Sequence, residues 1–242
     1  MKCSCTLHYC FLEPNPFFSN NILKFSEISN QIRPVLDYNW LQHPYLRMDL
    51  SRDNNQLAEV DLNDEREFTD FIFSELKEAD ASFGVGGYAE QRELYSRSNL
   101  FLGKEQRTIH LGIDIWGKAG TLVHAPLDGK VHSFANNAVH GDYGPVIILK
   151  HQIEGTVFHT LYGHLSTNSL TGLSKGKLIK AGEAFASFGV YSENFHWPPH
   201  LHFQAIIDMQ GYEGDYPGVC KASEKEFYLN NCPDPATLLS LR

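Results

Sequence analysis

Three short motifs in this chain place histidine and aspartate at spacings suited to a metal-dependent hydrolase. They are His110-Leu-Gly-Ile-Asp114, Tyr162-Gly-His164-Leu-Ser166 and His200-Leu-His202. Together they supply three plausible metal ligands and two spare imidazoles. A catalytic zinc takes three protein ligands and leaves a fourth position for water, and imidazole nitrogen and carboxylate oxygen are suitable donors where cysteine is absent. The motifs therefore indicate a zinc site.

We expect β-strands to position these residues. Side chains alternate along a strand, so His110 and Asp114 would share one face, and so would His200 and His202. A sheet that sets these two strands side by side would gather all four side chains over one small volume. His164, at the end of a third strand, could face the same volume.

The chain divides into three parts by composition. We expect residues 1–80 to form an N-terminal extension with an amphipathic helix. Residues 81–212, rich in glycine and β-branched residues, are expected to form the β domain that carries the zinc site. Residues 213–242 hold three prolines and are expected to form an irregular tail.

The helix is the clearest element of the N-terminal extension. Asp64 and Glu67 resemble a capping box, and apolar residues follow at offsets of 3, 4, 8 and 11, which describe one helical face. These residues are Phe68, Phe71, Ile72, Leu76 and Ala79. The apolar face must pack on the rest of the protein, because a lone helix of this length is marginal in water.

Short strands separated by turn residues are expected in the β domain. Alternating or buried apolar runs occupy residues 129–134, 146–149, 156–162 and 202–207. Strands at this spacing predict a mostly β fold (α+β overall), an antiparallel β-sandwich of the barrel-sandwich kind with a groove over the metal.

Composition narrows the class of protein. Hydrophobic residues make up 42% and charged residues 20% of the 242 residues, so a sizeable core is expected. We expect no membrane span, because no apolar stretch approaches ~18–20 residues. The segment 49–93 has 13 acidic and 4 basic residues and so accounts for the whole net charge of −9. Without a basic patch, nucleic acid is not an expected partner.

The N-terminus and the cysteines favour a cytoplasmic location. The first ten residues lack the long apolar run of a secretory signal, and an odd number of cysteines, five, suggests reduced thiols. Cys3, Cys5, His8 and Cys10 could bind a metal, but a frayed terminus is the favoured interpretation because their spacing is unusual for structural zinc.

The motifs resemble the lysostaphin-type zinc metallopeptidases, the β-lytic or LytM-like endopeptidases that cut peptidoglycan cross-links. The resemblance rests on His110-x-x-x-Asp114, on Tyr162–Ser166 and on Pro199-His200-Leu-His202-Phe203, and it covers about residues 105–207. Intervening segments agree with it. These are 125–131, 141–146 and 175–182.

The resemblance implies a role for each of the five motif residues. It makes His110, Asp114 and His202 the ligands of one zinc ion, and His164 and His200 the unliganded catalytic histidines. The implied reaction is hydrolysis of a peptide or peptidoglycan-like substrate. No His-Glu-x-x-His segment supplies a glutamate base, so an imidazole must move the proton, and either histidine could be that base.

The segment Phe83–Arg92 resembles what precedes such domains in a cytoplasmic subgroup. There the peptidase-like unit can be fused to sugar- or amine-metabolising enzymes, such as kinase-like and aminotransferase domains, so an amide hydrolase tied to small-molecule metabolism is an alternative. Tyr88, Glu90 and Arg92 could approach the site, but a solvated loop is the favoured interpretation.

Two other classes of protein compete with the peptidase. The segments 125–131 and 182–189 also look like biotinyl, lipoyl or phosphocarrier domains, although a carrier has no use for the His110 motif. A zinc-holding module that binds a peptide without cutting it would keep the same ligands.

The polar residues outside the three motifs are given structural interpretations. Asp142 is interpreted as a turn residue. The remaining histidines are interpreted as surface or core residues: His8, His43, His124, His132, His140, His151, His159 and His196.

Overall fold

The computed structural model describes residues 25–40, 42–93, 105–194 and 196–241. The possible metal site at Cys3, Cys5, His8 and Cys10 lies outside these ranges. Among the helices that are described, none has both the length and the apolar character needed to cross a membrane.

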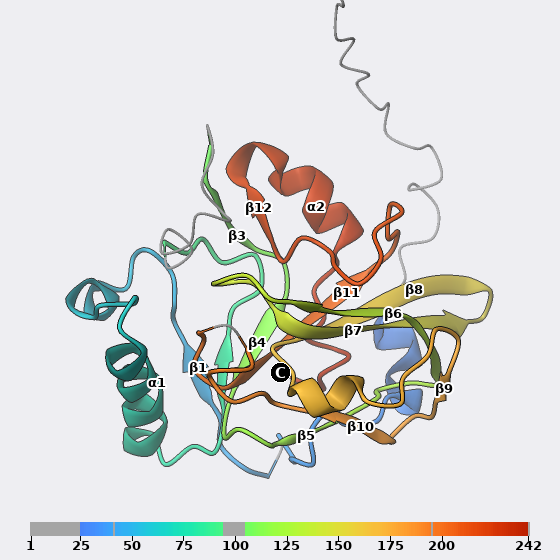
Figure 1. Cartoon of the computed structure of the whole chain (residues 1–242), viewed down its shortest axis with the longest axis horizontal. Helices are drawn as coiled ribbons and strands as arrows, with labels where there is room; N and C mark the ends of the chain where they lie inside the picture. Colours follow the sequence, from blue (N-terminus) through green and yellow to red (C-terminus); the bar gives the residue numbers. More distant parts are fainter. Residues whose placement is uncertain (1–24, 41, 94–104, 195, 242) are drawn as a thin grey trace, which may run out of the picture.

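A mixed sheet of eight strands forms the centre of the molecule (Figure 1). Its strand order is β1-β2-β4-β11-β8-β7-β6-β9, and only β1 and β2 pair in parallel. The strands span Leu46–Met48 (β1), Gly84–Gly86 (β2), Ile113–Trp116 (β4), His200–Ile206 (β11), Thr156–Gly163 (β8), Gly144–Ile153 (β7), Gly129–Asn137 (β6) and Leu178–Ile179 (β9). The predicted mostly β fold is confirmed, and the four apolar runs named above lie in β6, β7, β8 and β11.

Two small antiparallel sheets and two α-helices complete the fold of the described residues. One sheet pairs β5 (Leu122–His124) with β10 (Ala184–Ser187), and the other pairs β3 (Arg107–His110) with β12 (Val219–Lys221). The α-helices are α1 (Glu65–Glu78) and α2 (Lys225–Asn231). Short 3-10 helices span Phe25–Gln31, Asn55–Glu59, Thr167–Leu170 and Ala222–Glu224. The tail after residue 213, expected to be irregular, thus contains a strand and a helix.

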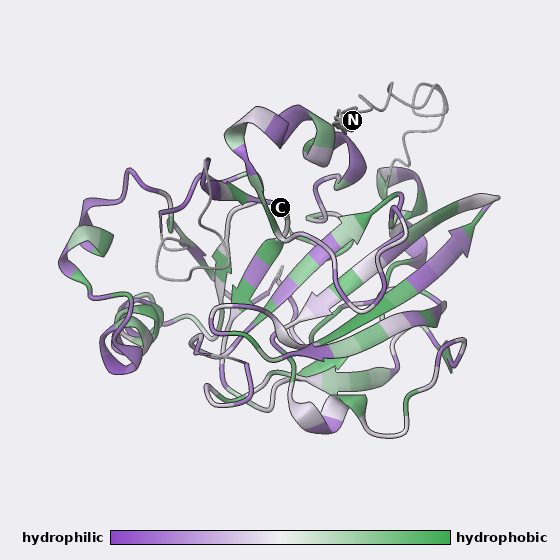
Figure 2. Cartoon of the chain, turned by 45° about the horizontal axis from the view of Figure 1, so that its top comes forward, coloured by the Kyte–Doolittle hydropathy of each residue, from purple (hydrophilic) through white to green (hydrophobic). Residues whose placement is uncertain are grey.

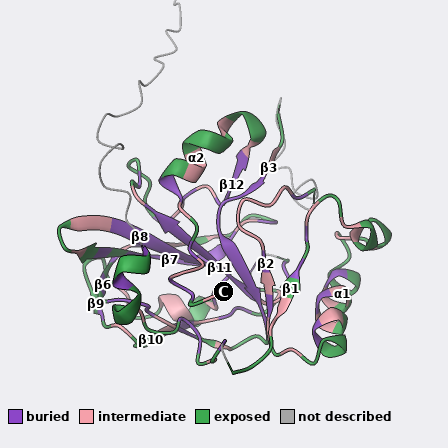
Figure 3. Ribbon diagram, turned by 180° about the vertical axis from the view of Figure 1, so that it is seen from behind, coloured by how far each residue is buried: buried purple, intermediate pink, exposed green. Residues whose placement is uncertain are grey.

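Both faces of the large sheet are buried at its centre. In β7, Ile147 and Leu149 join a core that includes Val123 of β5 and Ala186 of β10. The alternate residues Val146 and Ile148 join a second core, on the side of α2 and β12. Hydrophobic residues accordingly concentrate in the central strands (Figure 2), and these strands are the most buried part of the chain (Figure 3).

Helix α1 begins at the predicted N-cap. The Asp64 side chain accepts hydrogen bonds from the amides of Arg66 and Glu67, which satisfies two of the free N–H groups of the first turn. The capping box is only half formed, because the Glu67 carboxylate accepts from the amide of Asp61. Of the predicted apolar face, Phe68, Ile72 and Leu76 are buried.

Phe68 connects α1 to the centre of the sheet. Its ring centroid lies 5.9 Å from that of Trp116 and 6.3 Å from that of Trp197. Trp116 belongs to β4 and Trp197 to the loop before β11. The N-terminal helix therefore supports the two strands that carry the histidine and aspartate motifs.

We expect Phe68→Ala to lower the free energy of unfolding by about 3–5 kcal/mol, the usual cost of deleting a buried phenyl ring. Phe227→Ala is the matched control, because Phe227 is 53% exposed and its loss should change stability by less than about 0.5 kcal/mol. Urea unfolding of both variants measures the difference. Equal midpoints for the two would show that α1 does not support the sheet.

Candidate active site

The structure brings His110, Asp114 and His202 together in one buried cluster. Asp114 Oδ1 lies 3.0 Å from His202 Nδ1 and 3.3 Å from His110 Nε2, and the two ring nitrogens lie 3.0 Å apart. All three residues are at least 97% buried. In the described part of the chain, this is the one group of three or more histidine, cysteine or carboxylate side chains close enough to hold a metal ion.

Three different strands supply the three residues of the cluster. His202 of β11 lies opposite Asp114 of β4 in antiparallel register. His110 ends β3, which belongs to another sheet. The prediction that His110 and Asp114 share one strand face was wrong, because the chain breaks at Leu111 and Gly112. A Cβ at Gly112 would lie 2.8 Å from the His202 ring, so glycine leaves the room that the imidazole needs.

In both His110 and His202, the outer ring nitrogen, which points away from the cluster, donates a hydrogen bond to an oxygen atom. His110 Nδ1 donates to the Gly87 carbonyl oxygen at 2.8 Å. His202 Nε2 donates to Gln204 Oε1 at 2.9 Å, because the Gln204 amide nitrogen is itself directed at Pro217 O and Cys232 Sγ, both 3.2 Å away. In the neutral rings the inner nitrogens, His110 Nε2 and His202 Nδ1, are therefore free of protons.

These donors fit a metal ion. Two unprotonated ring nitrogens and a carboxylate oxygen face one another with no proton between them, which is unfavourable unless a cation lies among them. Burial is the largest influence on His110 and lowers its pKa to about 4, so this ring is neutral near pH 7. Burial would raise the pKa of Asp114, but His110 and the Arg92 guanidinium hold it well below its usual range.

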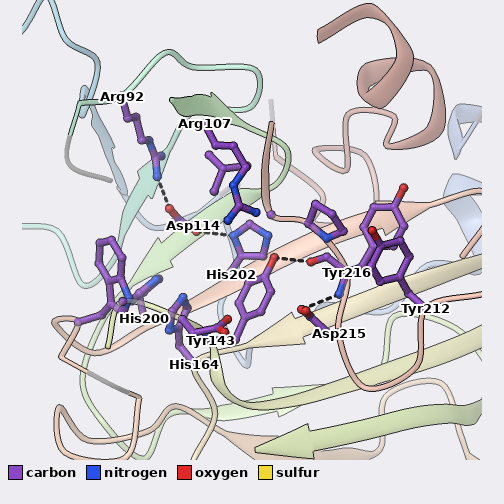
Figure 4. Close-up of a pocket in the computed structure, with 16 residues that line it drawn as sticks. Arg92, Arg107, Asp114, Tyr143, His164, His200, His202, Tyr212, Asp215 and Tyr216 are labelled. Carbon is purple, nitrogen blue, oxygen red and sulfur yellow. Dashed lines mark hydrogen bonds and ion pairs between the residues drawn. The ribbon is translucent and has the colours of Figure 1, made fainter. Parts of the chain in front are cut away.

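His164 and His200 lie together beside the cluster. Their ring centroids are 4.1 Å apart, and His200 stacks on Trp116 at 4.0 Å and 22°. His200 Nδ1 donates to the Pro198 carbonyl oxygen at 2.8 Å, so its Nε2 is unprotonated in the neutral ring. His164 follows the last residue of β8 and has a positive φ of 60°. Figure 4 shows four of the predicted site residues, Asp114, His164, His200 and His202, around one volume, and His110 lies beside Asp114 and His202.

Burial keeps these two imidazoles neutral. It lowers the pKa of His200 to about 4, although Asp114 opposes the shift. It also lowers the pKa of His164 well below its usual value, and the neighbouring His200 and His202 add to that effect. Neutral imidazole can accept or donate a proton, which general acid–base chemistry requires.

A cavity of about 180 Å³ opens over the cluster. Asp114, His164, His200 and His202 line it, together with Tyr143, whose hydroxyl donates to the Tyr216 carbonyl oxygen at 3.1 Å. Its lining also includes Arg107, Asp142, Tyr212, Asp215 and Tyr216. Asp142, interpreted as a turn residue, thus also faces the cavity. None of the seven other histidines that the structure describes lines it.

Several residues around the site were missed by sequence reasoning. Gln204 and Trp116 each lie two positions after a motif residue on the same strand face, so the strand period could have found them. Tyr88, Glu90 and Arg92 were expected in a solvated loop, which is wrong. Arg92 is 1% exposed, and the Tyr88 hydroxyl donates to the Cys232 carbonyl oxygen.

The β-rich fold and the buried His-Asp-His cluster define a domain of the metallopeptidase class. Residues 108–213 match the model of Peptidase family M23. This part of the chain is therefore similar to the M23 peptidase domain.

The chain is also similar to three other proteins. An "uncharacterized metalloprotease" of Haemophilus influenzae is 31% identical over 127 residues, which are 50% of this chain and 25% of that protein. The chain thus spans about a quarter of the length of this curated relative. A zinc-containing peptidase from Vibrio cholerae is 28% identical over 40% of this chain and 27% of its own, with a TM-score of 0.34. The catalytic domain of lysostaphin from Staphylococcus simulans is 24% identical over 53% of this chain and 85% of its own, with a TM-score of 0.36.

Asp142 generates a prediction about pH. Burial raises its pKa to about 6, the Tyr143 amide opposes the rise, and the nearby Asp215 adds to it. The folded protein then binds this proton more tightly than the unfolded chain, so stability is lost as the pH rises from about 4 through 6. Asp142→Asn should raise the free energy of unfolding near pH 7.5 by about 1 kcal/mol, a value discounted for partial solvent contact.

The same variant should match the parent near pH 4, where both carry a neutral side chain. Thermal unfolding at several pH values measures the difference. A constant difference between Asp142→Asn and the parent across this range would contradict a raised pKa of Asp142.

Proposed function

We propose that this chain is a zinc metallopeptidase that hydrolyses an amide bond of a short peptide, with peptidoglycan cross-link peptide as the first substrate to test. The observation that carries the proposal is the convergence of His110 Nε2, Asp114 Oδ1 and His202 Nδ1 beside two further imidazoles. The match of residues 108–213 to Peptidase family M23 supports it.

The chemistry of the donors favours zinc. Two imidazole nitrogens and one carboxylate oxygen form a ligand set known from catalytic zinc sites, and three protein ligands leave a position open. When bound, zinc would polarise the scissile carbonyl and lower the pKa of a water molecule toward ~7. His110, Asp114 and His202 are the residues that would hold it.

His200 is suited to accept the proton of the attacking water. Its Nδ1–H is held by the Pro198 carbonyl oxygen, which leaves Nε2 as the basic atom. Stacking on Trp116 fixes the plane of the ring. A base held in one tautomer and one plane needs no reorganisation when the proton moves.

His164 is suited to bind the carbonyl oxygen of the substrate. Its ring lies next to that of His200 and lines the cavity. A ring N–H that faces the cavity would donate a hydrogen bond to a substrate oxygen there. A preorganised donor of this kind stabilises the negative charge that develops on the carbonyl oxygen.

The cavity indicates how much of a substrate it can enclose. At about 180 Å³ it is smaller than the roughly 300–1,000 Å³ pockets that enclose drug-sized ligands. It can therefore hold the chain around one amide bond, and the rest of a longer substrate must lie outside.

We expect His200→Ala to bind zinc like the parent and to lose turnover by about 10²–10⁴-fold, the usual contribution of a general base. His202→Ala should lose both zinc and turnover. Zinc per chain is measured by elemental analysis, and hydrolysis of purified muropeptides and synthetic cross-link peptides is followed by mass spectrometry.

His140→Ala is a matched control, because His140 is exposed and does not line the cavity. It should keep both zinc and turnover. Near-normal turnover in His200→Ala would refute the role given to His200. A parent protein that binds zinc but cleaves no peptide would instead indicate a peptide-binding module without turnover.

A further inference from the structure

Arg92 forms ion pairs with Glu90 and with Asp114, and Figure 4 shows the pair with Asp114. Arg92 Nη1 donates to Asp114 Oδ2 at 2.5 Å, and Arg92 Nε donates to Glu90 Oε2 at 2.5 Å. The side chain of Arg92 is 1% exposed and that of Glu90 is 13% exposed. Such charge-assisted hydrogen bonds are about twice as strong as neutral ones, so the guanidinium connects the two carboxylates firmly.

The backbone around Arg92 is anchored to the strand that carries His110. The Arg92 amide donates to the Thr108 carbonyl oxygen, and the His110 amide donates to the Glu90 carbonyl oxygen. The Glu90 carboxylate also accepts from the Leu50 amide at 3.2 Å. Arg92 therefore approaches Asp114 from a fixed direction.

A glycine makes room for the guanidinium. Gly86 of β2 lies opposite Asp114 of β4 in the sheet. A Cβ at Gly86 would lie 2.7 Å from Arg92 Nη2, closer than side-chain atoms pack. Glycine at position 86 thus leaves room for the guanidinium beside Asp114.

The two oxygens of Asp114 have separate partners. Oδ2 is taken by Arg92, whereas Oδ1 faces the two inner ring nitrogens at 3.0 and 3.3 Å. A carboxylate can bind a metal through one oxygen or through both. Occupying Oδ2 leaves only Oδ1, and the charge of Glu90 offsets that of Arg92 beside a cation.

We propose that Arg92 is a positioning residue that keeps Asp114 a ligand through Oδ1 alone, and that Glu90 holds Arg92 in place. This inference rests on the proposed function, because it presupposes a metal ion at the cluster. It assigns to the segment before residue 108 a part in the site that the match to family M23 does not include.

The test compares Arg92→Met with Arg92→Lys and with a matched control, Arg52→Met. The Arg52 side chain is 50% exposed, and its Nε lies 3.7 Å from Oδ1 of the exposed Asp53. The dissociation constant of Zn²⁺ is measured by competition with a chromophoric chelator. The visible spectrum of the Co²⁺-loaded protein reports coordination geometry, because four-coordinate Co²⁺ absorbs more strongly than five-coordinate Co²⁺.

We expect Arg92→Met to bind Zn²⁺ about 10–100-fold more weakly, as is usual when a partner of a metal ligand is removed. Its Co²⁺ bands should weaken as Asp114 becomes free to bind through both oxygens. Arg92→Lys should fall between Arg92→Met and the parent, and Arg52→Met should equal the parent. A folded Arg92→Met with parental affinity and spectrum would overturn the inference and leave the proposed function standing.

Two further outcomes are decisive. If Arg92→Met does not fold, Arg92→Lys and Glu90→Gln take its place, and parental affinity and spectrum in both would overturn the inference. A parent protein that binds neither Zn²⁺ nor Co²⁺ would overturn the proposed function, and this inference with it.

Discussion

Three unshared electron pairs, on His110 Nε2, Asp114 Oδ1 and His202 Nδ1, meet in one buried volume, and the surrounding structure depends on that contact. Such an arrangement is unfavourable in a low-dielectric interior unless a cation compensates it. The antiparallel pairing of β4 with β11 and the end of β3 bring these atoms together. The hydrogen bonds from the outer ring nitrogens keep the lone pairs directed inward.

Much of this support comes from outside residues 108–213, the part that matches Peptidase family M23. The Gly87 carbonyl oxygen and the Arg92 guanidinium precede that part. Pro217 and Cys232, which orient Gln204, follow it. Phe68 of α1 packs on Trp116, which in turn stacks on His200. The flanking segments of the chain thus complete the site, and they are not simply appended to it.

Local patterns in the sequence predicted the helix at Asp64, the central strands and the five site residues, because capping, alternation and ligand chemistry act over short spacings. The position of Arg92 could not be read in this way. It depends on the register of β2 against β4, which joins residues about 30 positions apart, and a buried arginine is otherwise rare. The strand and helix of the tail were not predicted, because its three prolines indicated irregular structure. His110 and Asp114 lie on separate strands, and a Cβ at Gly112 between them would lie 2.8 Å from the His202 ring.

The central claim is that one metal ion is held by two imidazole nitrogens and one carboxylate oxygen of this chain. X-ray absorption at the zinc edge of the purified, zinc-loaded protein tests it most directly, because the fine structure identifies the type and number of ligand atoms. The account predicts about one zinc per chain, with nitrogen and oxygen neighbours at ~2.0–2.2 Å, the signature of two imidazoles and no sulfur. A zinc shell dominated by sulfur at ~2.3 Å, or one of oxygen alone without imidazole, would contradict it.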